Sequence, residues 1–175
     1  IPTLLGATVK TSNGAISILD SKGPIDVNTS NGRVTVKGSN GNAVIGTSNG
    51  RITVERHSGD LSARTSNGGI TVKSAKGRIN TETTNGSISI SLTDDGNGPI
   101  TANTSNGSIK LALRKDFKGH LKATVVNGDI SIKDPGNRIT SETVHKTNAD
   151  LVIGSGGENS ELKTSNGKIT IEIAQ

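Results

Sequence analysis

The tetrapeptide TSNG, found first as Thr11-Ser12-Asn13-Gly14, recurs along the chain and decides which fold the chain can form. Identical copies start at residues 29, 47, 65, 104 and 164, and the near copies TTNG and VVNG start at residues 83 and 125. Their asparagines lie 18 or 21 residues apart, and a last step of 39 divides into 21 and 18 when Asn148 is included. Such a period predicts a stacked array of nine repeats. The predicted corner asparagines are Asn13, Asn31, Asn49, Asn67, Asn85, Asn106, Asn127, Asn148 and Asn166.

Each repeat divides into two halves in which apolar and polar residues alternate. After one turn the chain reads Gly32-Arg33-Val34-Thr35-Val36, and nine residues after Gly32 a second glycine opens a similar half. Alternation with a period of two is typical of a β-strand that buries one face. Each repeat therefore predicts two short strands joined by two turns.

We predict an all-β fold, a parallel β-solenoid (right-handed β-helix or β-roll) with about nine coils of 18–21 residues and two short strands in each. Like strands would stack about 4.8 Å apart. The core would be thin and aliphatic, because Phe117 is the one aromatic residue. We expect residues 1–175 to form a single domain that is a fragment of a longer surface protein. An antiparallel meander is the alternative, since Asn-Gly is also a strong hairpin signal.

The repeated turn has a structural explanation in a solenoid, where every coil must turn the same corner. Asparagine and glycine tolerate the positive φ that a sharp corner needs. Stacked copies also let asparagine amides hydrogen-bond to the coils above and below, as side-chain ladders do. We therefore predict that the asparagines form a corner ladder and do not bind a ligand.

Two coils carry three extra residues at the turn opposite TSNG, within residues 92–99 and 113–120. Departures from a regular scaffold are places where function is often found. The edge that these turns form is therefore an alternative site for a small ligand or a cation. Carboxylates from these coils and the next one could together supply oxygen ligands to a cation such as calcium. The candidate metal ligands are Asp94, Asp95, Asp116 and Asp134. Arg114 and Lys115 oppose a cation, and simple drift of exposed loop lengths is the other explanation.

The sequence gives little support for a catalytic site or for a metal site elsewhere in the chain. There is no cysteine, and His57, His120 and His145 are scattered without a second ligand at useful spacing. The turns do not match the G-G-x-G-x-D repeat of calcium β-rolls, so a metal in every turn is not expected. The turns are also too short to wall a substrate cleft. We predict a non-enzymatic protein without a cofactor.

The net charge and the pattern of surface residues indicate which classes of partner the protein could bind. The net charge is 20 − 15 = +5, which suits weak attraction to anionic cell-wall polymers. Nucleic acid is not expected, because aromatic side chains that stack on bases are absent. A row of exposed hydroxyls that includes Thr35, Thr53 and Thr71 is a feature of some ice-binding solenoids, which makes ice binding a weaker alternative. Charged neighbours such as Arg33 and Lys37 count against that alternative.

The TSNGxIxV and GxIxAxT patterns, from Ala7 to Ile173, resemble a bacterial family of unknown function whose customary label is that of an adhesin. The LiaG-type proteins of cell-envelope stress operons belong to that family. The resemblance implies a β-solenoid on the cell surface or outside the cell, often behind a membrane anchor, and it implies no catalytic residues. No apolar run here is long enough to span a membrane, so we expect any anchor to lie outside this sequence.

The ends of a solenoid expose unpaired strand edges. Residues 1–5 (IPTLL) are candidates to cover the first coil, whereas residues 168–175 (KITIEIAQ) still have the pattern of a strand at the end of the sequence. We therefore predict either a missing C-terminal cap or end-to-end self-association.

Overall fold

The computed structural model describes residues 4–92, 96 and 98–175, and these residues form β-strands and turns without any helix. The strands are β1 (Ala7–Asn13), β2 (Ile16–Leu19), β3 (Ile25–Asn31), β4 (Val34–Asn40), β5 (Ala43–Thr47), β6 (Ile52–Ser58), β7 (Leu61–Asn67), β8 (Ile70–Lys76), β9 (Ile79–Asn85), β10 (Ile88–Ser91), β11 (Ile100–Asn106), β12 (Ile109–Leu113), β13 (Gly119–Lys133), β14 (Ile139–Val144), β15 (Asn148–Ile153) and β16 (Asn159–Ile173).

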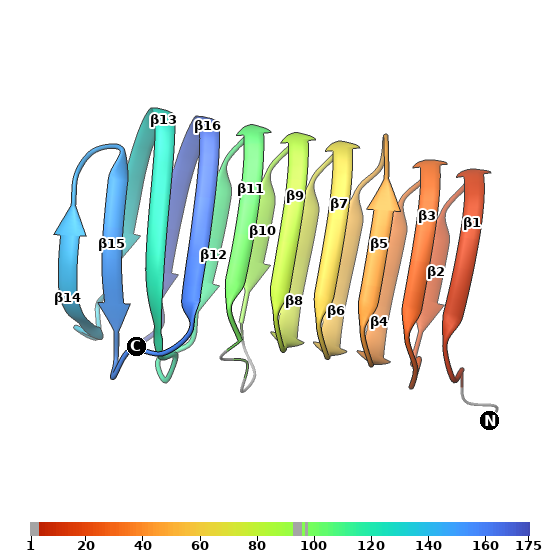
Figure 1. Cartoon of the computed structure of the whole chain (residues 1–175), viewed down its shortest axis with the longest axis horizontal. Coiled ribbons are helices and arrows are strands. Elements are labelled where there is room, and N and C mark those ends of the chain that lie inside the picture. Colours follow the sequence, from red (N-terminus) through yellow and green to blue (C-terminus); the bar gives the residue numbers. More distant parts are fainter. Residues whose placement is uncertain (1–3, 93–95, 97) are drawn as a thin grey trace.

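The chain winds as a right-handed solenoid with two parallel sheets (Figure 1). The front sheet, nearer the viewer in Figure 1, contains β1, β3, β5, β7, β9 and β11, and the back sheet contains β2, β4, β6, β8, β10 and β12. The register places each residue beside its counterpart one repeat away, as Val27 pairs with Val9 and Val34 with Ile52. The predicted solenoid is confirmed, and the antiparallel meander is excluded for these coils.

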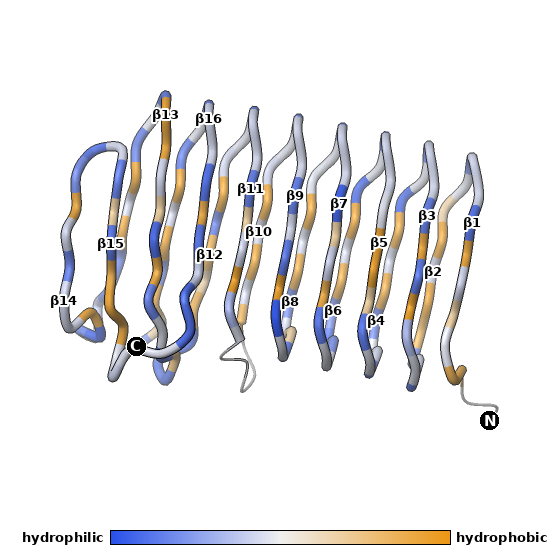
Figure 2. Tube along the Cα trace, in the orientation of Figure 1, coloured by the Kyte–Doolittle hydropathy of each residue, from blue (hydrophilic) through white to orange (hydrophobic). Residues whose placement is uncertain are grey.

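Alternation along the strands produces the core between the two sheets. Ile25, Val27, Val34 and Val36 are at most 2% exposed, while the residues between them face outward. Figure 2 shows the resulting apolar bands that repeat from coil to coil. Because each band is one aliphatic side chain deep on each sheet, the core is thin, as the composition predicts.

The last coils do not stack in the order of the sequence. β13 and β16 are long strands, each of which crosses from the front sheet to the back sheet and forms a whole coil. β16 pairs with β11 and β12 on one side and with β13 on the other. The final stretch of sequence is therefore an inner coil of the stack. The prediction of a C-terminal strand without a cap is wrong, because β12 and β13 flank residues 169–172 in the back sheet.

The stack has eight coils where nine were predicted, because residues 139–153 form an antiparallel hairpin instead. β15 pairs antiparallel with β13, and β14 pairs antiparallel with β15, so the hairpin extends only the front sheet. Asn148, predicted as a corner residue, lies opposite Thr124 at the start of β15. Here the asparagine is followed by Ala149 instead of glycine, and the packing of the corner glycines explains why that matters.

The glycines of the TSNG corner are required because successive backbones almost touch. A Cβ atom on Gly50 would lie 1.9 Å from the carbonyl oxygen of Gly32, and one on Gly68 would lie 2.0 Å from that of Gly50. An alanine in this position therefore cannot stack on the coil below. Ala149 has such a Cβ, and its strand leaves the parallel stack.

Positive φ, which we predicted for the asparagines at the TSNG corner, occurs mainly at the opposite corner. Asp20, Arg56 and Ser74 have φ between 52° and 55°, and Gly38 in the same column has φ of 66°. None of the corner asparagines has a positive φ, although Gly14 has φ of 113°. The TSNG asparagines are therefore selected for their side chains.

Candidate interaction surface

Eight asparagine side chains form a continuous hydrogen-bonded ladder along one edge of the stack. Each Nδ2 donates to the Oδ1 of the neighbouring coil over 2.8–3.0 Å, always in the same direction along the axis. The spatial order is Asn13, Asn31, Asn49, Asn67, Asn85, Asn106, Asn166 and Asn127. The ladder follows the stacking order, and the amides that form it are engaged with one another.

Threonine hydroxyls of the same corner are also engaged. The Oγ1 atoms of Thr65, Thr83 and Thr104 donate to glycine carbonyls of adjoining coils over 2.9–3.1 Å. Most polar groups of the TSNG turn are thus used to join coils, which leaves this corner a structural element.

The predicted cation site at the opposite edge is not assembled by the residues that the structure describes. Asp94 and Asp95 lie outside those residues. Asp116 is ion-paired with Arg114 at 2.8 Å, and Asp134 Oδ2 accepts a hydrogen bond from the backbone N–H of Ile139 at 2.8 Å. Within the described ranges, no group of three or more His, Cys, Asp or Glu side chains could hold a metal ion.

Phe117 lies within the extended turn at residues 113–120, but it is 1% exposed and belongs to the core. A Cβ atom on Gly119 would lie 2.8 Å from the phenyl ring, so Gly119 makes room for it. The three extra residues of this turn thus let the chain fold one aromatic side chain inward. The turn serves packing, and its other charged residues remain on the surface.

His57, near the end of β6, is buried at the corner that leads to β7 and is not accessible from solvent. Its Nε2 donates to the carbonyl of Asp60 at 3.4 Å, and its Nδ1 accepts from the Ser39 hydroxyl at 2.7 Å. Burial lowers the pKa of His57, because the charged form would lose its hydration. Ser39 and His57 are 3% and 1% exposed, so this serine–histidine pair is enclosed and solvent does not reach it.

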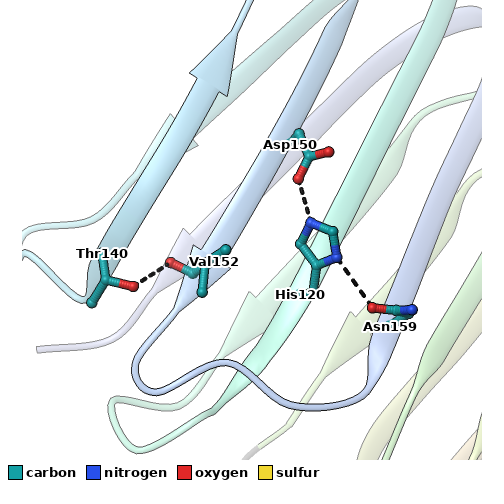
Figure 3. Close-up of polar contacts among 5 residues, drawn as sticks. All are labelled: His120, Thr140, Asp150, Val152 and Asn159. Atoms are coloured by element: carbon teal, nitrogen blue, oxygen red, sulfur yellow. Dashed lines mark hydrogen bonds and ion pairs between the residues drawn. The ribbon is translucent and has the colours of Figure 1, made fainter.

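On the outer surface of the front sheet, His120 of β13 contacts β15 of the hairpin on one side and β16 on the other (Figure 3). Its Nε2 contacts the carboxylate of Asp150 on β15, and its Nδ1 lies 3.1 Å from Oδ1 of Asn159 on β16. Both ring nitrogens face acceptor oxygens, which favours the doubly protonated ring. The hydrogen bond to Asp150, followed by that to Asn159, raises the pKa of His120.

The two outer faces of the stack differ in charge. The back face consists of three rows of outward side chains, which run from the residue before each back-sheet strand to the bend near the end of that strand, together with the matching residues of β16 and β13. It has seven cations and three anions, a net of 7 − 3 = +4, and it does not include Arg56 and Lys76, which lie at the corner where the strands bend. The cations are Arg33, Lys37, Arg51, Lys73, Lys110, Lys133 and Lys168, and the anions are Glu55, Asp129 and Glu172. The back face therefore carries nearly all of the net charge of +5.

The outer face of the front sheet is balanced by comparison, with a net of 5 − 5 = 0. The cations are Lys10, Arg64, Arg78, Lys122 and Lys163, and the anions are Asp26, Asp60, Glu82, Asp150 and Glu161. The composition shows the surplus of positive charge but not its position on one face. Assigning each outward residue of the sequence to its sheet predicts which face is basic. The order of the charges along that face cannot be predicted without knowing where β16 lies in the stack.

The acidic residues of the back face each lie among lysines. Glu55 contacts Lys37 at 3.0 Å and Lys73 at 3.9 Å, and the hydrogen bond from Lys37 is the largest influence that lowers the pKa of Glu55. Glu172 contacts Lys110 at 2.8 Å and Lys133 at 3.2 Å, with the same effect on its pKa. Each glutamate holds two lysines in place and leaves its cluster with a surplus of positive charge.

The hydroxyl row that suggested ice binding lies on this back face. Thr35, Thr53 and Thr71 pair in register, but Lys110 interrupts the row further along. Charged side chains flank the hydroxyls on both sides, at Arg33 and Lys37 for example. The face is therefore polar and charged, whereas ice-binding solenoids need neighbouring rows without charge.

In the part of the chain described, no helix has the length and apolar character needed to cross a membrane.

Comparison with known proteins places the chain in a family. One solved structure that matches is a protein from Clostridium sporogenes provisionally named a cell adhesion protein, with 13% sequence identity and a TM-score of 0.37. The match covers 81% of this chain and 56% of that one, so the chain spans little more than half of that protein's length. Among curated proteins, no relative matches the sequence. The sequence profile of the Toastrack DUF4097 family matches residues 7–172, and the chain belongs to that family.

Proposed function

We propose that the chain is a non-enzymatic adhesion or scaffold module that acts on the outside of a bacterial cell, as the resemblance to LiaG-type envelope proteins suggests. The observation that carries this proposal is the rod of eight coils, joined along one edge by the asparagine ladder. Such a rod has broad faces on which equivalent side chains recur with every coil.

A repeating face is suited to an extended partner. Each coil offers the same positions about 4.8 Å further along the axis, so a polymer that follows the axis meets a similar set of groups at each step. Weak contacts that are linked in this way combine into strong overall binding. Cell-surface polymers have this extended, repetitive character, which supports an adhesive role.

The chemistry of the described residues supports a non-enzymatic role. The one serine–histidine contact, between Ser39 and His57, is enclosed in the core. His120 has both ring nitrogens engaged, with Asp150 and with Asn159. A nucleophile or base would need to be free and accessible to act on a substrate.

The test is binding of the purified, fluorescently labelled protein to intact bacterial cells and to isolated cell walls, measured at low and high salt. We expect saturable binding to the cell surface that unlabelled protein displaces. The absence of binding to cells and walls under both salt conditions, together with a cytosolic location of the natural protein, would refute the proposal.

A further inference from the structure

We propose that the back face binds a linear anionic polymer carrying phosphate or carboxylate groups, which lies along the solenoid axis with Arg33 and Arg51 among its main contacts. This inference rests on the proposed adhesive function and names the class of partner. The first observation behind it is the difference between the two faces, +4 on the back and 0 on the front. Solubility alone would not require one face to hold the surplus.

The second observation concerns Arg33 and Arg51, which occupy equivalent positions on neighbouring coils. Val34 pairs with Ile52, so the arginines that precede them are neighbours about 4.8 Å apart. Within the described ranges, neither guanidinium has an ion pair. Like charges placed side by side destabilise a sheet, and a bound anion would remove that repulsion.

The surrounding side chains supply further donors for oxyanions. The hydroxyls of Thr35 and Thr53 lie in the row beside the two arginines, and Lys37 and Lys73 lie in the row beyond. Arginine forms paired hydrogen bonds to phosphate and carboxylate groups, and threonine adds a neutral donor. Glu55 contacts both lysines and keeps them in place.

The distribution of charge along the axis favours a polymer over a small anion. One basic cluster, with a net charge of 4 − 1 = +3, lies on β4, β6 and β8, and a weaker one, with a net of 3 − 2 = +1, lies on β12, β16 and β13. In the weaker cluster Lys168 pairs with Asp129 at 3.2 Å, and Lys110 and Lys133 pair with Glu172. Between the two clusters, the outward residues of the coil containing β10 are the uncharged Ser87, Ser89 and Ser91. A linear polyanion can engage both clusters at once and gain from their linkage, which a small anion cannot do.

A flat basic face could also meet an anionic membrane, but the side chains favour a soluble polymer. Proteins that bind at membrane surfaces insert apolar side chains beside their basic ones. On the back face, Leu19 at one end is the one large apolar side chain that is exposed among the described residues. The two basic clusters lie away from it on later coils.

The test uses the whole chain with inorganic polyphosphate and alginate as phosphate and carboxylate probes, and with neutral dextran as control. The variant Arg33→Ser/Arg51→Ser removes two charges from the back face. The matched variant Lys10→Ser/Arg64→Ser removes two charges from the front face. We expect the apparent Kd for at least one polyanion to rise about tenfold or more in the back-face variant and to change less than about twofold in the front-face variant. Dextran should not bind.

Several outcomes would overturn this inference. Equal losses in the two variants would show that net charge alone drives binding, and failure of both polyanions to bind would remove the basis for the site. Binding to phosphatidylglycerol vesicles without binding to either polymer would assign the face to membranes. Circular dichroism melting of each variant would exclude unfolding as a cause of lost binding. If both variants still attach to cells like the natural chain, the adhesive function stands and the back-face site is refuted.

Discussion

At the scale of single residues, the asparagine and the glycine of the TSNG turn have different structural roles. The asparagine joins coils through its side-chain amide, and the glycine permits the backbones to approach. Asparagine and glycine are usually grouped as turn formers because both tolerate positive φ. Here the positive φ lies mainly at the opposite corner, with Asp20, Arg56 and Ser74. The contacts between stacked coils therefore explain why the same turn recurs along the chain.

The ladder predicts a graded cost of removing asparagines. Asn67 donates one amide hydrogen bond and accepts another, so Asn67→Ala should lower the free energy of unfolding by about 1–2 kcal/mol. Asn13, at the end of the ladder, only accepts, so Asn13→Ala should cost about half as much. Urea denaturation of the two variants measures both values. Equal costs would contradict a ladder in which each amide bridges two neighbours.

The close approach of the corner glycines predicts a larger effect. Gly50→Ala should cost about 3 kcal/mol or prevent folding, because its Cβ would overlap the Gly32 carbonyl oxygen. Gly46 is the matched control: a Cβ there would lie 3.6 Å from Asn28 Oδ1, an ordinary contact. Thermal melting should show Gly46→Ala close to the natural chain. Similar melting temperatures for both variants would contradict this explanation of the glycine repeat.

At the scale of elements, the terminal hairpin is the part that departs from the repeat. β15 and β14 add to the front sheet alone, and His120 contacts Asp150 across the first strand pair. His57 lies far from the hairpin in sequence and is enclosed in the core. The two histidines therefore predict opposite effects of pH on stability.

The His120 contact should stabilise the fold below about pH 6.5, the ordinary pKa of histidine. Its pKa is raised in the folded state by Asp150 and Asn159, so the stabilisation is full below the unfolded pKa and is lost as pH rises through the folded pKa. The stability difference between the natural chain and His120→Gln should be larger at pH 5.5 than at pH 8.5. Lys122 opposes this effect, which keeps it modest. A difference that does not change with pH would contradict the contact.

His57 should act in the other direction. Its pKa is lowered by burial, so stability is highest above about pH 6.5 and falls as pH drops from there toward the folded pKa. His57→Leu removes the titrating group, at the cost of leaving the Ser39 hydroxyl without its acceptor. Unfolding measured from pH 4.5 to pH 8 should therefore depend less steeply on pH in this variant. An unchanged slope would show that His57 is not buried in its neutral form.

The sequence predicts these elements unevenly, for physical reasons. Alternation marks Val34 and Val36 as inward residues, and the period marks the coils, because both patterns act locally. The hairpin begins where Ala149 replaces the corner glycine, and a distant strand, β16, takes the place beside β11 and β12. The burial of Phe117 could not be predicted, since nothing nearby in the sequence shows that Gly119 makes room for it.

At the scale of the whole molecule, the order of the coils determines what each face presents. Because β16 lies between β12 and β13, Glu172 meets both Lys110 and Lys133, and Lys168 joins the same cluster. A stack in sequence order would place these charges differently. The second basic cluster, and with it the extended polyanion site, depends on the inserted coil.

The most direct test of the account is therefore disulfide cross-linking of the stack, which the cysteine-free chain permits without background. Ser105 and Ser165 lie between paired residues of β11 and β16, whereas Val126 lies on the far side of β16. We predict rapid oxidation of Ser105→Cys/Ser165→Cys, whose Cα atoms are about 4.8 Å apart. Ser105→Cys/Val126→Cys should remain reduced, since two coils separate the thiols by about 10 Å. Cross-linking of the second pair and not the first would show that the coils follow sequence order and would contradict the account.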